Sequence, residues 1–469
     1  MNTQRPSTCD SRQEGWSLAF QRASCDDRAM ADAVSTKRAA IALGAGLLAL
    51  LVAWRTCSKD ESGGQGSSAA SSSPAAKSGP GGSIEGGATG LSAPIAAAHA
   101  GNGEVIVAGL DVPAKAVRVQ RIDPNGKVVA DAMALGDVAW SADSDLKLVA
   151  HPTEGVAVTW RGLRGGKLVR ELAILGRDLS RKGEPVEVSA ASCATRDTVW
   201  FSDGATAVAR PLTGPSMKLD LPKGKDASLL CGASRAFAIL DDDDRTSILA
   251  IGRDRGPAIT VVRESDFGED EQRELAQYTV GDDVGFVRLG ASGAVAVREL
   301  TGGALGPLRK LRSSIPKDDD VVAVDASPKV LAIVYTQDAS SACPAGESAV
   351  ATKVTVLRVD RTTLEESTAE ISPGRCGQEV GPFFTGVLGD GVSIAWAERS
   401  GGAGKARAPI TGLSHATVMP SGAPALAHIE QPADALVDAG CDGKTCYAVA
   451  LVRRETADVP GMAKVLRYE

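Results

Sequence analysis

Short runs of alternating apolar residues, recurring from about residue 93 to the end of the sequence, constrain the fold of this chain most strongly. Each run has four to six residues, is rich in β-branched residues or Ala, and in most cases is bounded by Gly, Asp, Pro or Ser. Examples are Glu104–Ala108, Gly155–Trp160, Thr198–Phe201, Gly293–Val297, Val330–Val334 and Val392–Trp396. This pattern is typical of half-buried β-strands. The nearest approach to an amphipathic helix, Arg263–Tyr278, is highly charged and contains Gly268, so we expect a long loop or one short helix there.

The strands belong to a longer repeat, in which an apolar run leads into an Arg and then into turn-forming residues. The copies surround Arg121, Arg177, Arg210, Arg253, Arg298, Arg358, Arg407 and Arg453, and their seven intervals of 33 to 60 residues average about 47. We interpret this Arg as a structural residue at an exposed strand end. A period in the forties fits one four-stranded propeller blade, and blades must stack to cover their apolar faces. We therefore predict an all-β fold, a β-propeller of seven or eight blades over residues 93–469. The alternative is two β-sandwich domains divided near residue 280.

Two segments resemble repeats of known exported propellers. The stretch Arg121–Val129, with Ile122-Asp123 and Gly126-Lys127-Val128, resembles the outer hairpin of quinoprotein-type repeats, which also occur in the lipoprotein propeller of outer-membrane barrel assembly. The Trp that ends those repeats is missing here. Phe201-Ser-Asp-Gly-Ala-Thr206 is similar to the sialidase Asp-box but is two residues shorter and has no aromatic residue after Thr206. The resemblance implies an exported β-propeller and carries no particular activity with it.

A single uncharged, mostly apolar segment, residues 39–54, lies between Lys37-Arg38 and Arg55. Its sixteen residues would span about 24 Å as a helix, and the flanking basic side chains and Trp54 can reach the headgroups. We expect an uncleaved transmembrane anchor, or signal-anchor. The alternatives are lipidation at Cys57 and cleavage as a signal peptide.

Basic residues near this segment predict its orientation. Six Lys or Arg precede it, whereas Arg55, Lys59 and Lys77 are the basic residues between it and residue 100. By the positive-inside rule, residues 1–38 are a disordered cytoplasmic tail of a single-pass inner-membrane protein, and the bulk of the chain is periplasmic. Residues 55–92, rich in Gly, Ser, Ala and Pro, are expected to be a flexible linker. Met30 is an alternative start, because it would leave a conventional short n-region.

Nine cysteines divide between the two parts of the chain. An even number, six, follows the linker, which fits three disulfides in an oxidising compartment. Asp442-Gly443 can turn a hairpin that joins Cys441 to Cys446. By order in the chain we pair Cys193 with Cys231 and Cys343 with Cys376, although sequence alone does not fix this connectivity. The chain has no Cys-x-x-Cys pair, and we expect no zinc site.

Acidic runs are the main candidates for ligand binding. Asp241, Asp242, Asp243 and Asp244, then Asp282-Asp283, then Asp318–Asp320 all fall between predicted strands. If these loops gathered at one end of a propeller, their oxygens could hold Ca²⁺, with Asp241–Asp244 as the first candidates and solvated turns as the alternative. Ser414-His415 lacks the glycines and the strand-to-helix context of a nucleophile elbow, so we expect a turn there and no catalytic residue. We place His151 and His428 at strand margins, as structural histidines.

The composition limits the partners. A net charge of −7 with no basic block argues against nucleic acid. We expect a membrane-anchored module that binds a protein or a cell-envelope polymer, has no cofactor and performs no catalysis. The alternative is a glycan-acting hydrolase or lyase on the same fold, which would need convergent carboxylates with Arg, Tyr or His.

Overall fold

A computed structural model gives the fold of one compact unit, Pro80–Glu469. It describes residues 83–88, 91–100, 103–111, 114–132, 146–151, 155–188, 192–195, 198–202, 206–211, 216–221, 227–242, 245–251, 259–267, 272–302, 304–344, 350–400, 409–441, 445–452 and 462–468. Within these ranges no helix has the length and apolarity needed to cross a bilayer. The predicted tail (1–38), the predicted anchor (39–54), Met30 and Cys57 lie outside them.

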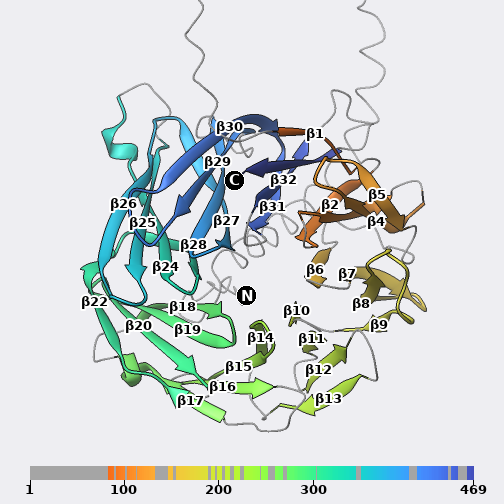
Figure 1. The fold of residues 1–469 in the computed structure, drawn as a ribbon, viewed down its shortest axis with the longest axis horizontal. Coiled ribbons are helices and arrows are strands. Elements are labelled where there is room, and N and C mark those ends of the chain that lie inside the picture. The colour runs from red at the N-terminus through yellow and green to blue at the C-terminus, as the bar shows by residue number, and fades with distance from the viewer. Residues whose placement is uncertain are drawn as a thin grey trace, which may run out of the picture. The chain divides into compact units, whose positions relative to one another are not determined.

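The described chain forms eight antiparallel sheets, which we call blades 1 to 8 in chain order, and this confirms the predicted propeller. The sheets follow one another around a central axis (Figure 1). Blade 1 contains β2 (Ser92–His99), β3 (Val105–Asp111), β4 (Ala116–Ile122) and β5 (Val128–Ala132). Blade 2 contains β6 (Lys147–His151), β7 (Gly155–Arg164), β8 (Lys167–Gly176) and β9 (Val186–Glu187). Blade 3 contains β10 (Ser192–Ala194), β11 (Thr198–Ser202), β12 (Thr206–Pro211) and β13 (Met217–Asp220). Blade 4 contains β14 (Ala227–Cys231), β15 (Ala236–Asp242), β16 (Arg245–Ile251) and β17 (Ile259–Arg263).

Blades 5 to 8 complete the ring. Blade 5 contains β18 (Gln272–Val280), β19 (Asp283–Gly290), β20 (Ala294–Thr301) and a fourth strand divided into β21 (Ala304–Leu305) and β22 (Arg309–Ser314). Blade 6 contains β23 (Asp320–Ala326), β24 (Val330–Asp338), β25 (Thr352–Asp360) and β26 (Glu366–Pro373). Blade 7 contains β27 (Gln378–Leu388), β28 (Gly391–Ser400), β29 (Ile410–Val418) and β30 (Ala425–Ala433). Blade 8 contains β31 (Ala435–Cys441), β32 (Cys446–Val452), β33 (Met462–Tyr468) and β1 (Ser83–Ala88). Two short 3₁₀ helices, η1 (Glu264–Phe267) and η2 (Ser340–Ala342), lie in connections.

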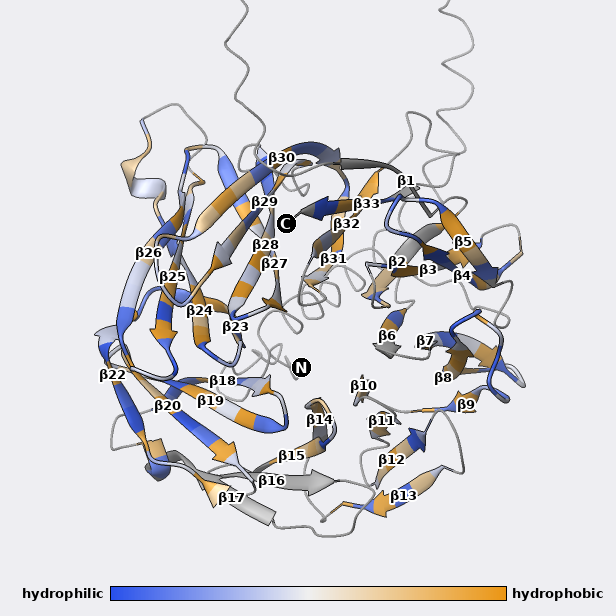
Figure 2. Cartoon of the chain, in the orientation of Figure 1, coloured by the Kyte–Doolittle hydropathy of each residue, from blue (hydrophilic) through white to orange (hydrophobic). Residues whose placement is uncertain are grey.

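The hydrophobic core lies between the blades. In β7, Val156, Val158 and Trp160 pack with blade 1, whereas Ala157 between them packs with blade 3. Period-2 alternation therefore serves two interfaces at once, because successive side chains point to opposite faces of a sheet. Apolar and polar residues alternate along many of the strands in Figure 2. Each described core cluster joins two neighbouring blades around the ring, which excludes two separate sandwiches.

The N-terminal strand closes the ring. Strand β1 pairs with β33 as the outermost strand of blade 8, so the first and last described strands share one sheet (Figure 1). The pairing joins the chain ends through backbone hydrogen bonds. The expected linker, residues 55–92, therefore overlaps the fold, since Ser83–Ala88 forms β1 and β2 begins at Ser92. The composition of this segment did not indicate a strand, because Gly and Ala are poor strand formers. Such residues can still form a strand when they pair with the edge of an existing sheet.

The Arg repeat coincides with the third strand of several blades. Arg121, Arg210, Arg298 and Arg358 lie in β4, β12, β20 and β25. Arg121 donates to the carbonyl oxygen of Arg177 in the next blade and is only 7% exposed. The interpretation as structural residues is supported for these copies, but the expected exposure of Arg121 is wrong. In Arg263–Tyr278, a short helix occurs as η1, and β18 occupies much of the remainder.

Candidate functional site

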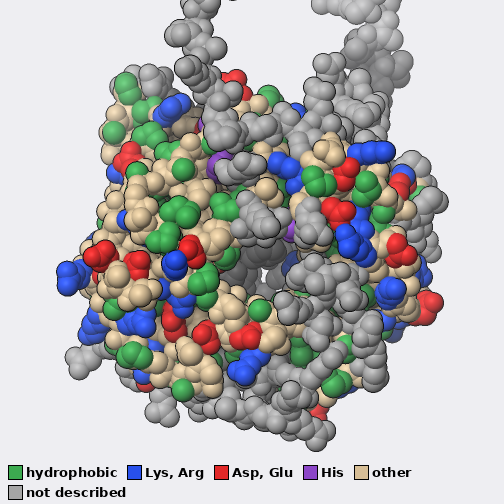
Figure 3. Space-filling view, viewed as in Figure 1, with side chains coloured by type: hydrophobic (Ala, Val, Ile, Leu, Met, Phe, Trp, Pro, Cys, Tyr) green, Lys and Arg blue, Asp and Glu red, His purple; other side chains and the backbone are tan. Residues whose placement is uncertain are grey.

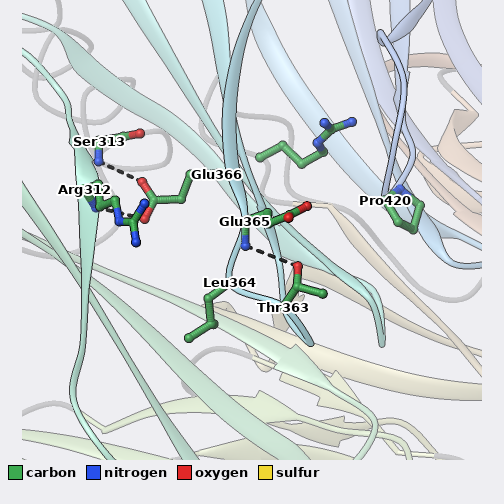
Figure 4. Close-up of a pocket in the computed structure, with 8 residues that line it drawn as sticks. Arg312, Ser313, Thr363, Leu364, Glu365, Glu366 and Pro420 are labelled. Atoms are coloured by element: carbon green, nitrogen blue, oxygen red, sulfur yellow. Dashed lines mark hydrogen bonds between the residues drawn. The ribbon is translucent and has the colours of Figure 1, made fainter.

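A groove opens on the rim of the propeller where blades 5, 6 and 7 meet; we call it the rim groove. It has a volume of about 620 Å³ and is lined by Arg312, Ser313, Arg358, Thr363, Leu364, Glu365, Glu366 and Pro420 (Figure 4). These residues come from β22, from β25 and the turn that follows it, and from the β29–β30 turn. The volume lies within the usual range for ligand sites.

A bulge in β22 forms one wall of the rim groove. Ala294 pairs with Ser314 but Ala296 pairs with Lys310, so residues 311–313 leave the ladder. The freed N–H groups of Arg312 and Ser313 donate to Glu366 of blade 6 at 2.8 and 2.7 Å (Figure 4). Burial alone would raise the pKa of Glu366, but these bonds outweigh it and the pKa is lowered. Glu366 therefore holds blades 5 and 6 together as a carboxylate.

The β25–β26 turn presents an apolar side chain at the mouth of the groove. The Asp360 carboxylate accepts bonds from the N–H groups of Thr362 and Thr363, at 2.8 and 2.7 Å. Leu364 then adopts a left-handed conformation with φ of 61° and is 44% exposed. A bulky residue rarely occupies this region of backbone space, and such strain is concentrated at functional positions. Leu364 is thus held in solvent by a rigid turn.

Blade 7 supplies the opposite wall. The Arg358 Nη1 donates to the carbonyl oxygens of Met419 and Gly422 at 3.1 and 2.6 Å, which fixes the β29–β30 turn against blade 6. Met419 is 41% exposed beside Pro420. The rim groove therefore combines guanidinium groups with exposed apolar side chains. This combination suits an extended peptide that carries an apolar residue and a carboxylate.

A second cavity, which we call the polar pocket, lies in blade 6 and has a volume of about 330 Å³. Its polar lining includes Asp319, Tyr335, Gln337, Lys353, Thr355 and Glu370. The Lys353 Nζ and a Glu370 oxygen form an ion pair at 2.7 Å. The pocket lies at the end of the propeller that carries the β24–β25 connection and the connection from β22 to β23.

The acidic runs do not share one end of the propeller. Asp282 lies in a first-to-second-strand turn, whereas Asp241 and Asp242 end the second strand β15 and Asp320 begins the first strand β23, which places these residues at the opposite end, because successive turns of a meander alternate. Asp282 accepts bonds from the Ser234 hydroxyl and from the N–H groups of Ser234 and Arg235, so it joins blades 4 and 5. The condition that all three runs gather at one end is therefore not met for Asp282. Strand β15 ends at Asp242, and Asp243 and Asp244 lie outside the described residues. The calcium hypothesis for Asp241–Asp244 stays a prediction.

Ser414 lies inside β29 and His428 inside β30, so the predicted turn and the predicted strand margin are both wrong. Ser414 donates to Glu398 of β28 at 2.5 Å and lies 2.8 Å from His428 Nδ1, and Gln378 of β27 donates to Glu398 at 2.6 Å. All four strands of blade 7 meet in this cluster. Because the one hydroxyl proton is directed to Glu398, Nδ1 acts as the donor to Ser414. The hydroxyl belongs to a residue that is 6% exposed, which fits a structural network better than a nucleophile.

His99 and His415 lie among buried groups. His99 stacks on Tyr447 at 5.5 Å, and the Tyr447 hydroxyl donates to Asp438 at 2.8 Å. Burial raises the pKa of Asp438 to about 7 and lowers the pKa of His415 to about 4. His151 ends β6. Within the described ranges no three His, Cys, Asp or Glu side chains are grouped to hold a metal.

The six cysteines form the three expected disulfides. Cys193 of blade 3 is bonded to Cys231 of blade 4, so this disulfide joins neighbouring blades. Cys343 is bonded to Cys376, which joins two connections at the end that carries the polar pocket. Cys441–Cys446 joins β31 to β32.

The sheet topology defines the class of this protein, a β-propeller. No protein-family model matches the sequence, and no curated protein matches it. Similar solved structures include the Pyrococcus horikoshii acylaminoacyl peptidase, with 12% identity, 69% of this chain and 51% of that chain covered, and a TM-score of 0.42. Hsv2 of Kluyveromyces lactis is 12% identical, with 64% of this chain and 90% of that chain covered and a TM-score of 0.36. The Nup133 β-propeller domain of Vanderwaltozyma polyspora is 10% identical, with 66% of this chain and 91% of that chain covered and a TM-score of 0.35. At these values the fold assignment rests on the topology of this chain.

Proposed function

We propose that this chain is a membrane-anchored β-propeller that binds a protein partner in the rim groove. The main observation in support is the exposure of Leu364. A rigid turn holds this apolar residue 44% exposed at the mouth of a concave site. Burying the remaining exposed surface of Leu364 contributes roughly 1 kcal/mol, because 44% of the residue is still exposed. Arg312 and Arg358 line the groove together with Glu365 and Glu366, and Glu366 already accepts two backbone N–H groups, so a guanidinium group can pair with an acidic residue in the partner segment.

Location outside the cytoplasm is part of the proposal. The segment 39–54 between basic residues supports a bilayer anchor. Three disulfides in the described chain support an oxidising compartment. On the face in Figure 3, side chains of both charge signs are interspersed, which favours a local contact over a large apolar interface.

We also propose that the protein does not catalyse a reaction. The chain offers a Ser–His–Glu cluster, but its hydroxyl lies on the buried residue Ser414 and its proton is directed to Glu398. The glycan-acting alternative requires convergent carboxylates. Turnover of any member of a panel of envelope glycans by the purified full chain would favour that alternative, and absence of turnover is the expected result.

The binding proposal is tested by site-specific photocrosslinking in membranes that contain the full chain. A crosslinking residue in place of Leu364 is expected to give one discrete adduct. The matched control is Leu219 in β13 of blade 3, which is 38% exposed and far along the ring from the groove. Equal adducts at both positions, or none at Leu364, would contradict the proposal.

Two further samples separate specific contact from proximity. Arg312→Glu, with the crosslinker kept at position 364, reverses a groove charge and is expected to abolish the adduct. Extraction with alkaline carbonate tests the anchor: the full chain should stay with the membrane, and deletion of residues 39–54 should release it. If Cys57→Ser releases the chain while residues 39–54 remain, lipidation replaces the helical anchor.

A further inference from the structure

Asp319 is a buried carboxylate that lines the polar pocket, and no described cation lies within ion-pair distance of it. The residue is 5% exposed and lies directly before β23. Within the described part of the chain, its carboxylate forms no hydrogen bond or ion pair. A buried charge of this kind is costly unless it is paired. Burial raises the pKa of Asp319, and the charges of Arg273 and Lys353, which act in the opposite direction, do not offset the combined effect of burial, Asp318 and Asp320.

The cations nearest to Asp319 are engaged elsewhere. Lys353 is paired with Glu370 at 2.7 Å across β25 and β26. Arg273 of β18 donates Nη1 to the carbonyl oxygen of Pro316 at 3.0 Å and Nη2 to the Asp319 carbonyl oxygen at 3.2 Å. Arg273 therefore fixes the backbone of the β22–β23 connection. The Asp319 carboxylate is positioned rigidly and remains available to a ligand.

The rest of the lining consists largely of groups that can accept hydrogen bonds. Tyr335, Gln337 and Thr355 supply hydroxyl and amide oxygens, and Glu370 supplies a second carboxylate. With one Lys against two carboxylates, the lining carries a net negative charge. It disfavours phosphates and carboxylates as ligands, and a neutral sugar would leave Asp319 uncompensated.

We propose that the polar pocket binds one alkylammonium or guanidinium group, with Asp319 as its counter-ion. A cavity of about 330 Å³ is suited to a single side-chain-sized ligand. The group can belong to a free amine or to a Lys or Arg side chain of a peptide. The pocket and the rim groove are separate cavities, so this proposal is independent of the proposed function.

Isothermal titration of the full chain in detergent micelles tests the pocket without any variant. The probes are agmatine and the blocked peptide acetyl-Gly-Arg-Gly-amide, against the same peptide with citrulline and against glucose. Saturable binding of either cationic probe, with binding of the citrulline peptide at least about tenfold weaker, is expected. Binding of agmatine without binding of the peptide identifies a site for free amines, and binding of the peptide identifies a site that accepts a side chain. Equal binding of the neutral probes, or no binding of either cation, overturns the proposal.

Substitution assigns the counter-ion. Asp319→Asn should weaken binding of the cationic probe at least about tenfold, because a charge-assisted bond is lost. Asp318→Asn is the matched control: it removes the same charge from an exposed neighbouring residue and should change affinity less than about threefold. Circular dichroism establishes that both variants are folded. If Asp319→Asn does not fold, Tyr335→Phe, which removes a lining hydroxyl, is expected to weaken binding in its place. Wild-type affinity in a folded Asp319→Asn variant, or in the Tyr335→Phe variant that replaces it, would contradict the assignment.

Discussion

The contact between blades 5 and 6 gives the sharpest test of what holds this propeller together. Arg361, in the β25–β26 turn, donates Nε and Nη2 to one Glu299 oxygen at 3.0 and 2.8 Å. The Tyr278 hydroxyl donates to the same oxygen at 2.8 Å. The Arg361 Nη1 also donates to the carbonyl oxygens of Ser327 and Pro328, both at 3.1 Å. The perturbation is Arg361→Ala.

The burial of Arg361 and Glu299 determines how much stability this substitution removes. The side chains of Arg361 and Glu299 are only 14% and 15% exposed, so water replaces little of what the substitution removes. Breaking a buried ion pair by deleting one partner costs about 3 to 5 kcal/mol, mainly because the other charge is left uncompensated. Tyr278 still donates to Glu299 in the variant, which places the expected loss near the lower end, about 3 kcal/mol. Adding Glu299→Gln to Arg361→Ala removes the orphaned charge and should restore part of the stability.

Urea unfolding followed by circular dichroism measures the effect, with Lys329→Ala as the matched control. Lys329 and Asp390 form a contact of similar length, 2.7 Å, between blades 6 and 7, but their side chains are 55% and 49% exposed. Solvent screening should leave the Lys329→Ala midpoint within experimental error of wild type. If Arg361→Ala shifts the midpoint no more than Lys329→Ala does, the argument from burial is refuted.

Three further perturbations test other contacts. Gly285→Ala should lower stability by about 1 to 3 kcal/mol in thermal unfolding, because a Cβ there would lie 2.0 Å from the Tyr278 ring, and an unchanged Tm would contradict this. The pKa of Glu366 is lowered in the fold, so its contribution is present above its unfolded pKa and is lost as pH falls through its folded pKa. The wild type should therefore exceed Glu366→Gln in urea midpoint at pH 7 by more than at about pH 3.5, and an equal difference at both pH values would oppose this account. Replacing Cys193 and Cys231 by Ser removes a disulfide between positions 38 residues apart and should lower the free energy of unfolding by about 3 to 4 kcal/mol. An unaltered urea midpoint would contradict this prediction.

The groups that form the candidate sites were only partly visible in the sequence. Asp319 belonged to an acidic run, but nothing near it indicated that Lys353 and Glu370 complete the same pocket. Glu366 carried no signal, because its partners are backbone N–H groups freed by a bulge 54 and 53 positions away. Ser414 was interpreted as a turn residue, since the polar cluster that satisfies it within β29 is drawn from four strands.

The sequence by itself indicated many of the strands, an approximate blade period and the all-β fold class. Period-2 alternation can be recognised within about six residues of sequence. When blades stack, both faces of each sheet need apolar side chains. The even number of cysteines after the linker also indicated three disulfides. Only the tertiary structure decided that β1 closes the ring, that Leu364 is held exposed at a groove and that Asp319 lines a pocket with no described cation within ion-pair distance. These features join residues tens of positions apart, and their proximity depends on strand register and on how each blade is rotated against the next.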